Sequence, residues 1–499
     1  MSGTGTTNKV FTYSTVGGDT LVLVDNDTTA GIDTAILLTG SVTTLDRTFF
    51  TSSADDTITG VTGNTILQGG GGNDSLTGNT GADTLSGGAD NDTLNGAAGA
   101  DTIIGGAGND SLIGGASDGV RDNIDGGLGN DTITGDGGDS VSGSDGNDSL
   151  TGVTGLNTID GGFGDDTIVG GTGADTITGG ADGLSAAGFF LNGGNNSISG
   201  GSGIDSITGS GGNDTLDGGN DNDIIDGGDG SDLITGGEGD DYLAAGLGTS
   251  GNDTISGGNG NDTIMGQVVS VVFNGDDGDD SIQGSNANAG DTITGGAGND
   301  TINGTSGEDN ISGGTGDDSI QGQFDSDLID GGEGNDTIVG SSSKDTITGG
   351  AGDDEITGGT GADILTGGEG VDTFVFTGSL DESPATLVGA DRITDFLSGT
   401  DRIDVVNIVT SGAATCQQVA ATTAITTFAQ ALTAANVIFN DATSHVKIIA
   451  YTVGTDTVVF FDNGADAVAS NADQAIILTG HLALTFGDFT TSGPVPMEV

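Results

Sequence analysis

The chain has 499 residues, of which 102 are glycine and 4% are aromatic, a composition that excludes a conventional large hydrophobic core. Its 74 acidic and seven basic residues give a formal net charge of -67, so a compact state would repel itself unless cations neutralised it. Nucleic acid is excluded as a partner, because phosphate contacts need the Lys and Arg that this chain lacks. Divalent metal is the expected partner.

The N-terminal segment MSGTGTTNKVFTYSTVGG has no basic stretch followed by an apolar one, and nowhere does an uninterrupted apolar run reach about 18 residues. We therefore expect neither an N-terminal secretion signal nor a membrane span. The single cysteine, Cys416, excludes an intrachain disulfide and a Cys-based zinc site. We expect it to be a small buried hydrophobe.

Residues 1–50 are predicted to form an N-terminal β-rich unit. TVGGDTLVLVDN (15–26) is similar to TVGTDTVVFFDN (452–463), and AILLTGSV (35–42) is similar to AIILTGHL (475–482). The two blocks keep their order, and the distance between them differs by three residues. This predicts a related β-rich unit at each end of the chain.

Residues 51–376 are dominated by the nonapeptide G-G-x-G-x-D-x-U-x, where U is aliphatic. Examples are GGAGNDSLI (105–113), GGLGNDTIT (126–134) and GGEGNDTIV (331–339), and about 35 copies of varying quality lie between Asp56 and Asp372. An acidic, glycine-rich composition alone would fit a disordered chain equally well. The periodicity favours an ordered array.

Each residue type of the repeat has a physical role. Glycine allows tight turns with positive φ, the Asp places a carboxylate at the end of the turn, and x-U-x forms a short strand with U facing inward. One such strand cannot bury its side chain alone, whereas stacked coils can. Two nonapeptides per coil predict an all-β parallel β-roll of about 17 coils.

The repeats alternate in quality along the array. At a spacing of about 18 residues, one series runs from GGGGND ending at Asp74 to GGEGVD ending at Asp372. Nearly all loops of this series match the motif closely. The intervening loops include poor versions, such as SSSKD ending at Asp345. We therefore predict one edge of the roll that is fully equipped for cations and a second edge that is equipped only in part.

Four repeats are longer than nine residues. Three expansions end at Asp122, Asp253 and Asp291 and are assigned to the weaker edge, whereas the fourth, at 179–190, is assigned to the stronger edge. Such expansions are candidate contact surfaces, although tolerated loop variation is the commoner explanation.

Residues 377–499 are predicted to form a C-terminal capping domain, because glycine thins out and β-branched and aromatic residues become more frequent. TTFAQALTAANVIF (426–439) has the apolar spacing of a short helix.

The repeats resemble those of the RTX family of type I secreted proteins. GGEGVDTFVFTGSL (367–380) and ADRITDFLSGTDRIDVV (390–406) are similar to the segment that follows the roll in serralysin-like and cyanobacterial members. The resemblance implies a right-handed roll and export through a type I secretion channel, directed by an uncleaved signal in the C-terminal domain. The protein would then be extracellular or on the cell surface.

In that family each calcium ion lies between two turns of one edge, held by loop carbonyls and motif carboxylates, a ligand set that suits a hard cation. The resemblance implies these ligands on the stronger edge: Asp74, Asp92, Asp110, Asp131, Asp148, Asp166, Asp205, Asp223, Asp241, Asp262, Asp280, Asp300, Asp318, Asp336, Asp354 and Asp372. On the weaker edge it implies Asp214, Asp232, Asp345 and Asp363. Asn157 and Asn196 replace the Asp, which argues against calcium at their loops.

Enzymatic activity is not expected. A zinc protease of this family would need His-Glu-x-x-His, but the only histidines are His445 and His481. One G-x-S-x-G string surrounds Ser117, in an expanded turn without the strand-to-helix elbow that a serine nucleophile requires.

We therefore predict a calcium-binding structural protein that folds on meeting calcium outside the cell, because the ligand cages do not exist in the unfolded chain. The related terminal units predict head-to-tail self-association into a surface layer or filament. The alternatives are that these units cap the sheet edges of a monomer, or that the protein is an adhesin or ligand-binding module, including one that binds ice.

Overall fold

The computed structural model consists of two compact units, Met1–Ile255 and Ser256–Val499. The structure describes residues 9–14, 20–25, 34–38, 48–50, 53–60, 62–115, 119–180, 194–246, 251–267, 270–286, 290–376, 390–405, 415–418, 431, 446–453, 455–461, 474–480, 484 and 488–490. Within these residues, no helix has the length and apolar character required to cross a bilayer.

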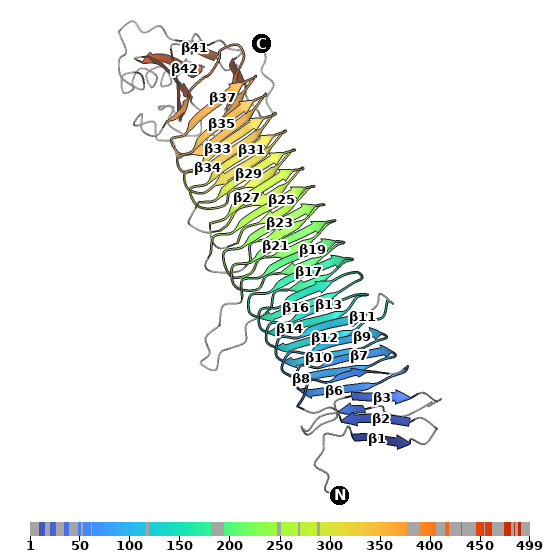
Figure 1. Ribbon diagram of the computed structural model, residues 1–499. Coiled ribbons are helices and arrows are strands. Elements are labelled where there is room, and N and C mark those ends of the chain that lie inside the picture. Colours follow the sequence, from blue (N-terminus) through green and yellow to red (C-terminus); the bar gives the residue numbers. More distant parts are fainter. Residues whose placement is uncertain are drawn as a thin grey trace, which may run out of the picture. The chain divides into compact units, whose positions relative to one another are not determined.

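The repeats of the first unit form two parallel sheets, as predicted (Figure 1). Odd-numbered strands make up sheet A: β5 (Thr57–Thr59), β7 (Ser75–Thr80), β9 (Thr93–Ala98), β11 (Ser111–Gly115), β13 (Thr132–Gly135), β15 (Ser149–Gly152), β17 (Thr167–Thr172), β19 (Ser197–Ser202), β21 (Thr215–Asn220) and β23 (Leu233–Glu238). Even-numbered strands make up sheet B: β4 (Thr48–Phe50), β6 (Ile66–Gly71), β8 (Thr84–Ala89), β10 (Thr102–Ala107), β12 (Asn123–Leu128), β14 (Ser140–Asp145), β16 (Thr158–Phe163), β18 (Thr176–Thr178), β20 (Ser206–Thr208), β22 (Ile224–Asp226) and β24 (Tyr242–Ala244).

The second unit repeats this arrangement. Its odd-numbered strands are β25 (Thr254–Asn259), which begins in the first unit, β27 (Val272–Asp277), β29 (Thr292–Ala297), β31 (Asn310–Thr315), β33 (Leu328–Glu333), β35 (Thr346–Ala351), β37 (Ile364–Glu369) and β39 (Asp391–Ile393). Its even-numbered strands are β26 (Thr263–Met265), β28 (Ser281–Gln283), β30 (Thr301–Asn303), β32 (Ser319–Gln323), β34 (Thr337–Ser342), β36 (Glu355–Thr360), β38 (Thr373–Phe376), β40 (Arg402–Val405) and β45 (Phe489–Thr490).

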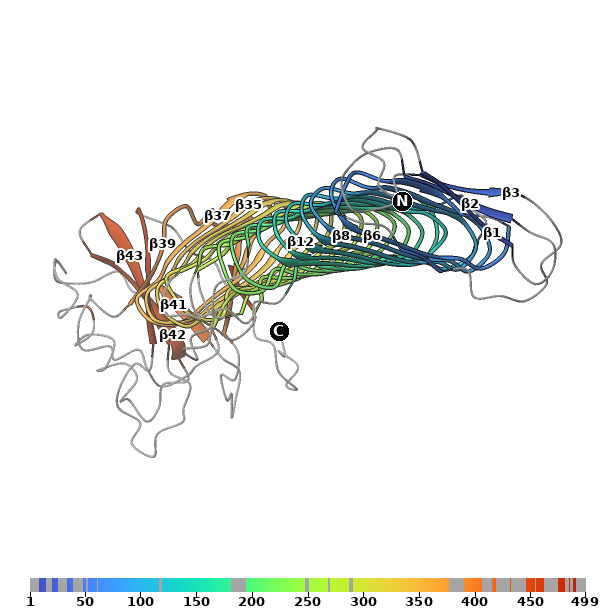
Figure 2. The ribbon, with the colours of Figure 1, turned by 60° about the horizontal axis from the view of Figure 1, so that its bottom comes forward.

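The chain winds alternately through the two sheets, so most strands pair in parallel with the strand two places further along. For example, Ile103 of β10 lies opposite Leu85 of β8 on one side and Ile124 of β12 on the other. The result is a parallel β-solenoid of about 16 turns, close to the 17 coils that the repeat predicts. Figure 2 shows successive coils winding around the space between the sheets.

The interior of each unit is a thin column of side chains. In β8 the buried residues are Leu85 and Gly87, while Thr84, Ser86 and Gly88 are more exposed. The aliphatic residue of each repeat therefore faces inward, and so does the first glycine of the motif, which contributes no side chain. One large apolar group per repeat makes a small core, so the array needs a further source of stability.

Two other glycines of the motif serve the turn. In the loop that ends at Asp110, Gly106 and Gly108 have φ values of 121° and 140°, which side-chain-bearing residues rarely adopt. A Cβ on Gly108 would also lie 2.1 Å from the carbonyl oxygen of Asp90 in the preceding coil. Glycine at these positions therefore lets consecutive turns stack closely without strain, although Asp90 at the equivalent position of the preceding coil also has a positive φ, 75°.

Related three-stranded units lie at the two ends of the chain, as the sequence similarity predicts. At the N-terminal end β1 (Lys9–Ser14), β2 (Thr20–Asp25) and β3 (Thr34–Leu38) form an antiparallel meander. At the C-terminal end β42 (Val446–Val453), β43 (Asp456–Phe461) and β44 (Gln474–Leu478) do the same, with β41 (Thr415–Gln418) parallel to β42.

The two meanders have the same strand register. Thr20 lies opposite Leu38, and its counterpart Thr457 lies opposite Leu478. In each unit the third strand of the meander also pairs in parallel with a terminal strand of sheet A, β3 with β5 in the first unit and β44 with β39 in the second. The meanders therefore extend sheet A, as expected of capping units.

Some predictions fall outside the described residues. Of the helix predicted over 426–439, only Ala431 is described; it is helical and buried. The side chain of Cys416, both histidines, Ser117 and most of the expansion at 179–190 are not described.

Candidate calcium sites

The motif residues of successive coils are joined by hydrogen bonds into two columns in each unit. The backbone N–H of Asp74 donates to Oδ1 of Asp92 at 2.7 Å, and that of Asp92 donates to Oδ1 of Asp110 at 2.7 Å. We call the column that precedes sheet A strands ladder A and the column that precedes sheet B strands ladder B. Their Asp side chains are almost fully buried.

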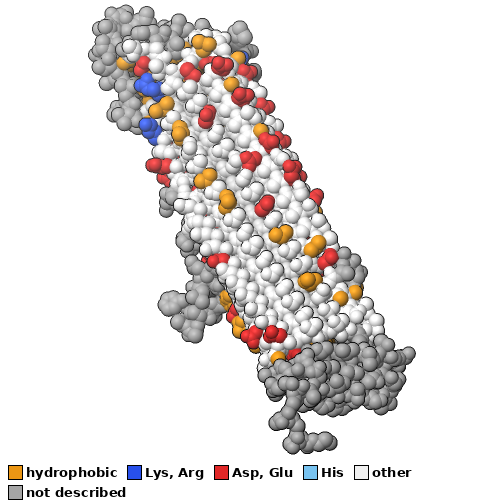
Figure 3. All heavy atoms as spheres, in the orientation of Figure 1, with side chains coloured by type: hydrophobic (Ala, Val, Ile, Leu, Met, Phe, Trp, Pro, Cys, Tyr) orange, Lys and Arg blue, Asp and Glu red, His pale blue; other side chains and the backbone are white. Residues whose placement is uncertain are grey.

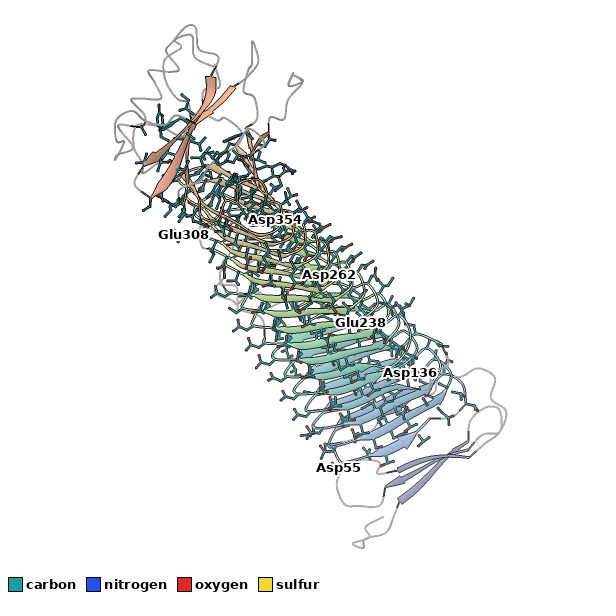
Figure 4. All side chains as sticks on the ribbon, turned by 90° about the horizontal axis from the view of Figure 1, so that it is seen from above. Asp55, Asp136, Glu238, Asp262, Glu308 and Asp354 are labelled. Carbon is teal, nitrogen blue, oxygen red and sulfur yellow. The ribbon has the colours of Figure 1, made fainter. Side chains whose placement is uncertain are left out.

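Ladder A consists in the first unit of Asp56, Asp74, Asp92, Asp110, Asp131, Asp148, Asp166, Asn196, Asp214, Asp232 and Asp253, and in the second unit of Val271, Asp291, Asp309, Asp327, Asp345, Asp363 and Asp391. Ladder B consists in the first unit of Thr65, Asp83, Asp101, Asp122, Asp139, Asn157, Asp175, Asp205, Asp223 and Asp241, and in the second unit of Asp262, Asp280, Asp300, Asp318, Asp336, Asp354, Asp372 and Asp401. Figure 4 labels Asp262 and Asp354 of ladder B.

The second carboxylate oxygen has a different environment. Oδ2 is buried and accepts no hydrogen bond from the described protein at seventeen of the twenty predicted ligands, all but Asp241, Asp262 and Asp372. Because a buried polar atom without a partner is unfavourable, a column of such atoms needs a physical explanation.

A carbonyl oxygen of the next coil lies beside sixteen of these Oδ2 atoms, all but that of Asp363. A Cβ built on Gly69 would lie 2.2 Å from Oδ2 of Asp74 and 2.5 Å from the carbonyl oxygen of Gly87. Gly313, with Oδ2 of Asp318 and the carbonyl oxygen of Gly331, repeats this arrangement in the second unit. We call this space beside the first glycine of a motif, bounded by Oδ2 and the carbonyl of the next coil, the cradle.

Without a cation the cradle disfavours a charged carboxylate. Burial, together with the neighbouring carboxylates, raises the pKa of Asp74 and of Asp131 to about 7 against the lowering effect of the backbone hydrogen bond. Burial likewise raises the pKa of Asp345 to about 8. Two oxygens that face each other in a dry site require a positive charge or a proton between them.

The oxygen donors of the cradle fit calcium, which prefers a mixture of carboxylate and carbonyl ligands. A calcium ion would be held by Oδ2 of the motif Asp and by loop carbonyls such as that of Gly87. Among the described residues, no three acidic, histidine or cysteine side chains converge on one point. Each site would therefore depend on backbone carbonyls as well as on carboxylates.

The structure corrects the predicted assignment of the stronger series to a single edge. Asp74 to Asp166 belong to ladder A, but Asp205 and its successors belong to ladder B. The N–H of Asp166 donates to Asn196 at 2.8 Å, and the N–H of Asp175 donates to Asp205 at 2.6 Å. The expansion lies between two successive motif positions, Asp175 and Asn196. Three repeats rather than an even number therefore separate Asp166 from Asp205, and the better loops change edge there.

An exposed residue before many of the motif Asp residues forms a second hydrogen-bonded column. The N–H of Asn91 donates to Oδ1 of Asn73 at 2.9 Å, and that of Asn109 donates to Oδ1 of Asn91 at 2.7 Å. These bonds point along the array in the opposite direction to those of the buried ladder. In the second unit the same column accompanies ladder B, where the N–H of Asp317 donates to Asn299.

Four Asp residues that were not predicted as ligands have the same buried, unpartnered Oδ2 and the same cradle: Asp83, Asp175, Asp309 and Asp327. Their nine-residue spacing from predicted ligands would have identified them. Their loops match the motif less closely, but a weaker loop sequence can still place its Asp correctly.

In other loops the protein itself satisfies Oδ2. Oδ2 of Asp139 accepts a hydrogen bond from the N–H of Asp136. Oδ2 of Asp291 accepts one from the N–H of Ser285, and Oδ2 of Asp401 accepts one from the N–H of Leu397. None of these three was a predicted ligand.

Comparison with known proteins agrees with this geometry. A sequence profile of the RTX calcium-binding nonapeptide repeat, in four copies, matches residues 50–85, 59–94, 86–120, 95–133, 117–150, 142–177, 190–225, 218–249, 247–267, 272–302, 286–320, 303–338 and 339–374. These segments cover more than half of the chain. The chain belongs to the RTX calcium-binding repeat family.

This RTX protein is also similar to a solved structure, the solution structure of the AlgE6R3 subunit from the Azotobacter vinelandii mannuronan C5-epimerase. The two share 27% sequence identity over 36% of this chain and 80% of that chain, with a TM-score of 0.18. None of the curated proteins compared with the chain matches it.

Proposed function

We propose that this RTX repeat protein is a secreted structural protein of the cell surface or extracellular matrix that folds when calcium fills its cradles. The observation that carries the proposal is the column of buried Oδ2 atoms without hydrogen-bond partners, such as those of Asp74 and Asp318. With a net charge of -67 and one aliphatic core residue per repeat, the metal-free chain has little to hold it together.

Export through a type I secretion channel fits this dependence. The low calcium concentration of a cytoplasm would keep the chain unfolded for export, and higher extracellular calcium would then fold it. Circular dichroism tests the coupling: we expect little β signal in chelator and a large gain on adding calcium. A β spectrum that is the same in chelator and in calcium would refute it.

We further propose that the protein assembles head to tail through its terminal meanders. Their shared register and their pairing with sheet A in each unit support this proposal. A contact between the N-terminal meander of one copy and the C-terminal meander of the next is heterologous, and such contacts generate open filaments. Light scattering and negative-stain microscopy in calcium should detect polymers. Monodisperse single particles would instead support meanders that only cap sheet edges.

The second candidate is a monomeric adhesin or ligand-binding module. Outward Thr residues such as Thr132 and Thr134 of β13 favour it, but β propensity also explains Thr at these positions. The visible face shows apolar side chains scattered among polar ones (Figure 3). Thermal hysteresis would test ice binding. We expect no enzymatic activity, because most motif carboxylates have a proposed role in binding calcium.

A further inference from the structure

Two ladder positions have an amide in place of a carboxylate, and the structure shows what the amide does. Asn157 and Asn196 are 2% and 3% exposed. Their Oδ1 atoms keep the ladder continuous, accepting from the N–H of Asp139 at 2.9 Å and from the N–H of Asp166 at 2.8 Å.

The Nδ2 atom of each Asn occupies the position that Oδ2 has elsewhere. A Cβ on Gly152 would lie 2.6 Å from Nδ2 of Asn157 and 2.4 Å from the carbonyl oxygen of Gly170. Nδ2 of Asn157 donates to that carbonyl at 3.3 Å, and Nδ2 of Asn196 donates to the carbonyl of Gly209 at 3.5 Å. In the Asn loops the amide N–H therefore donates to the carbonyl of the next coil. In the Asp loops the equivalent carbonyl faces an Oδ2 atom that has no hydrogen-bond partner.

The Asn side chains cannot turn around to offer their oxygen to a cation. If Nδ2 and Oδ1 of Asn157 exchanged places, the N–H of Asp139 would face an N–H donor and lose its buried acceptor, which is unfavourable. The ladder therefore fixes the orientation of the amide and directs its N–H groups into the cradle, where they repel a positive ion.

A third cradle is filled in another way. Val271 takes the ladder position in the second unit, with its N–H donating to Oδ1 of Asp291 at 2.8 Å. A Cβ on Gly266 would lie 2.5 Å from Cζ of Phe273, whose side chain is 1% exposed. At Asn157, Asn196 and Val271, where the carboxylate is missing, an amide or an aromatic ring thus occupies the space.

We infer that Asn157 and Asn196 are built-in substitutes for bound calcium, each closing its cradle with an N–H bond in place of an ion. The inference deepens the proposed function and depends on it. Asn157 lies in ladder B and Asn196 in ladder A, one before and one after the expansion. At these two points consecutive coils stay joined without calcium.

Native mass spectrometry of the full chain, folded in calcium, tests the inference by counting bound ions. We expect one additional ion in Asn157→Asp, one in Asn196→Asp and two in the double variant. The matched control is Asp223→Asn, which replaces the carboxylate of a buried cradle in the same unit by an amide. This variant should bind one ion fewer than the wild type.

The outcomes separate the inference from the proposed function. Unchanged counts in both Asn→Asp variants, with one ion lost in Asp223→Asn, would overturn the inference and leave calcium binding intact. A wild-type chain that binds no calcium would overturn both. Should the Asn→Asp variants not fold, Asp223→Asn decides alone: one ion lost with an unchanged β spectrum supports an amide that replaces calcium, and loss of the fold contradicts it.

Discussion

The backbone N–H of Asp166 donates to the side chain of Asn196, 30 residues further along the chain, at a distance of 2.8 Å. This one bond shows that Asp166 and Asn196 are consecutive in ladder A, so the long expansion adds no coil between them. The ladders remain in phase across it, while the sequences of the better loops move from ladder A to ladder B. Both edges of the first unit carry cradles.

The two carboxylate oxygens of a motif Asp should make separable contributions. Asp318→Ala removes the acceptor of the Asp300 N–H, which lies 2.8 Å from Oδ1, and removes Oδ2 from the cradle. Asp318→Asn keeps the acceptor and supplies an N–H to the cradle, as Asn196 does. We expect Asp318→Ala to lower the free energy of unfolding by at least about 1–3 kcal/mol, and Asp318→Asn by less.

Urea unfolding in saturating calcium measures both effects. Glu333→Ala, a change at an exposed position of the same unit, is the control and should shift the free energy by less than about 0.5 kcal/mol. Equal losses for Asp318→Ala and Asp318→Asn would contradict a separate structural role for Oδ1.

The first glycine of the motif should be intolerant of any side chain. A Cβ on Gly69 would meet Oδ2 of Asp74 at 2.2 Å and the carbonyl of Gly87 at 2.5 Å, whereas a Cβ on Gly71 has no atom closer than 3.7 Å. We expect Gly69→Ala to destabilise the folded state by about 1–3 kcal/mol and to weaken calcium binding. Gly71→Ala, two residues away, should leave both almost unchanged, and similar effects of the two substitutions would argue against the cradle.

Much of this architecture was predictable from the sequence. The nine-residue period fixes which residues face inward, so Leu85, Ile103 and Ile124 lie in the core as expected. The similarity of the terminal segments predicted two related units, and the strand registers confirm it. Counting repeats failed at the expansion near residue 180, because sequence spacing cannot show whether added residues form a loop or a coil.

The contacts within the cradle could not be predicted from the sequence, for a different reason. Asp83 and Asp175 have the same buried Oδ2 as the predicted ligands, although loop quality gave no indication of it. The role of Nδ2 in Asn157 depends on which groups of the neighbouring coils face it. Only the stacking of coils brings the N–H of Asp139 and the carbonyl of Gly170 to the same side chain.

Acid should partly replace calcium. In the metal-free fold, burial raises the pKa of Asp318 and of Asp309 to about 7 from the usual value of 3.8. Between about pH 4 and 7 the folded chain therefore binds more protons than the unfolded chain, and its stability falls as the pH rises through that window. A protonated Asp also offers the cradle a donor, as Asn157 does.

With chelator present, we expect more β signal in circular dichroism at pH 6 than at pH 8. Calcium binding should release protons at pH 6, which calorimetry in buffers of different ionisation enthalpy would detect. Loss of β structure on lowering the pH from 8 to 6 without calcium would contradict this account.

Assembly should depend on the N-terminal meander. Val22 lies in the middle strand of that meander, paired with both Thr12 and Ile36, so Val22→Pro removes a hydrogen-bond donor from its centre. We expect this variant to keep the calcium-dependent β spectrum and to lose polymers in light scattering. Val459→Pro changes the equivalent position of the C-terminal meander and should have the same effect. Filaments of normal length from either variant would count against assembly through the meanders.

The most direct test of the central claim is to locate calcium by its anomalous scattering in crystals grown with the ion. The account predicts a peak between Oδ2 of Asp92 and the carbonyl of Gly105, and a peak between Oδ2 of Asp318 and the carbonyl of Gly331, with further peaks at the equivalent cradles. It predicts none at the cradles of Asn157 and Asn196. Empty cradles at Asp92 and Asp318 in calcium-grown crystals would contradict it.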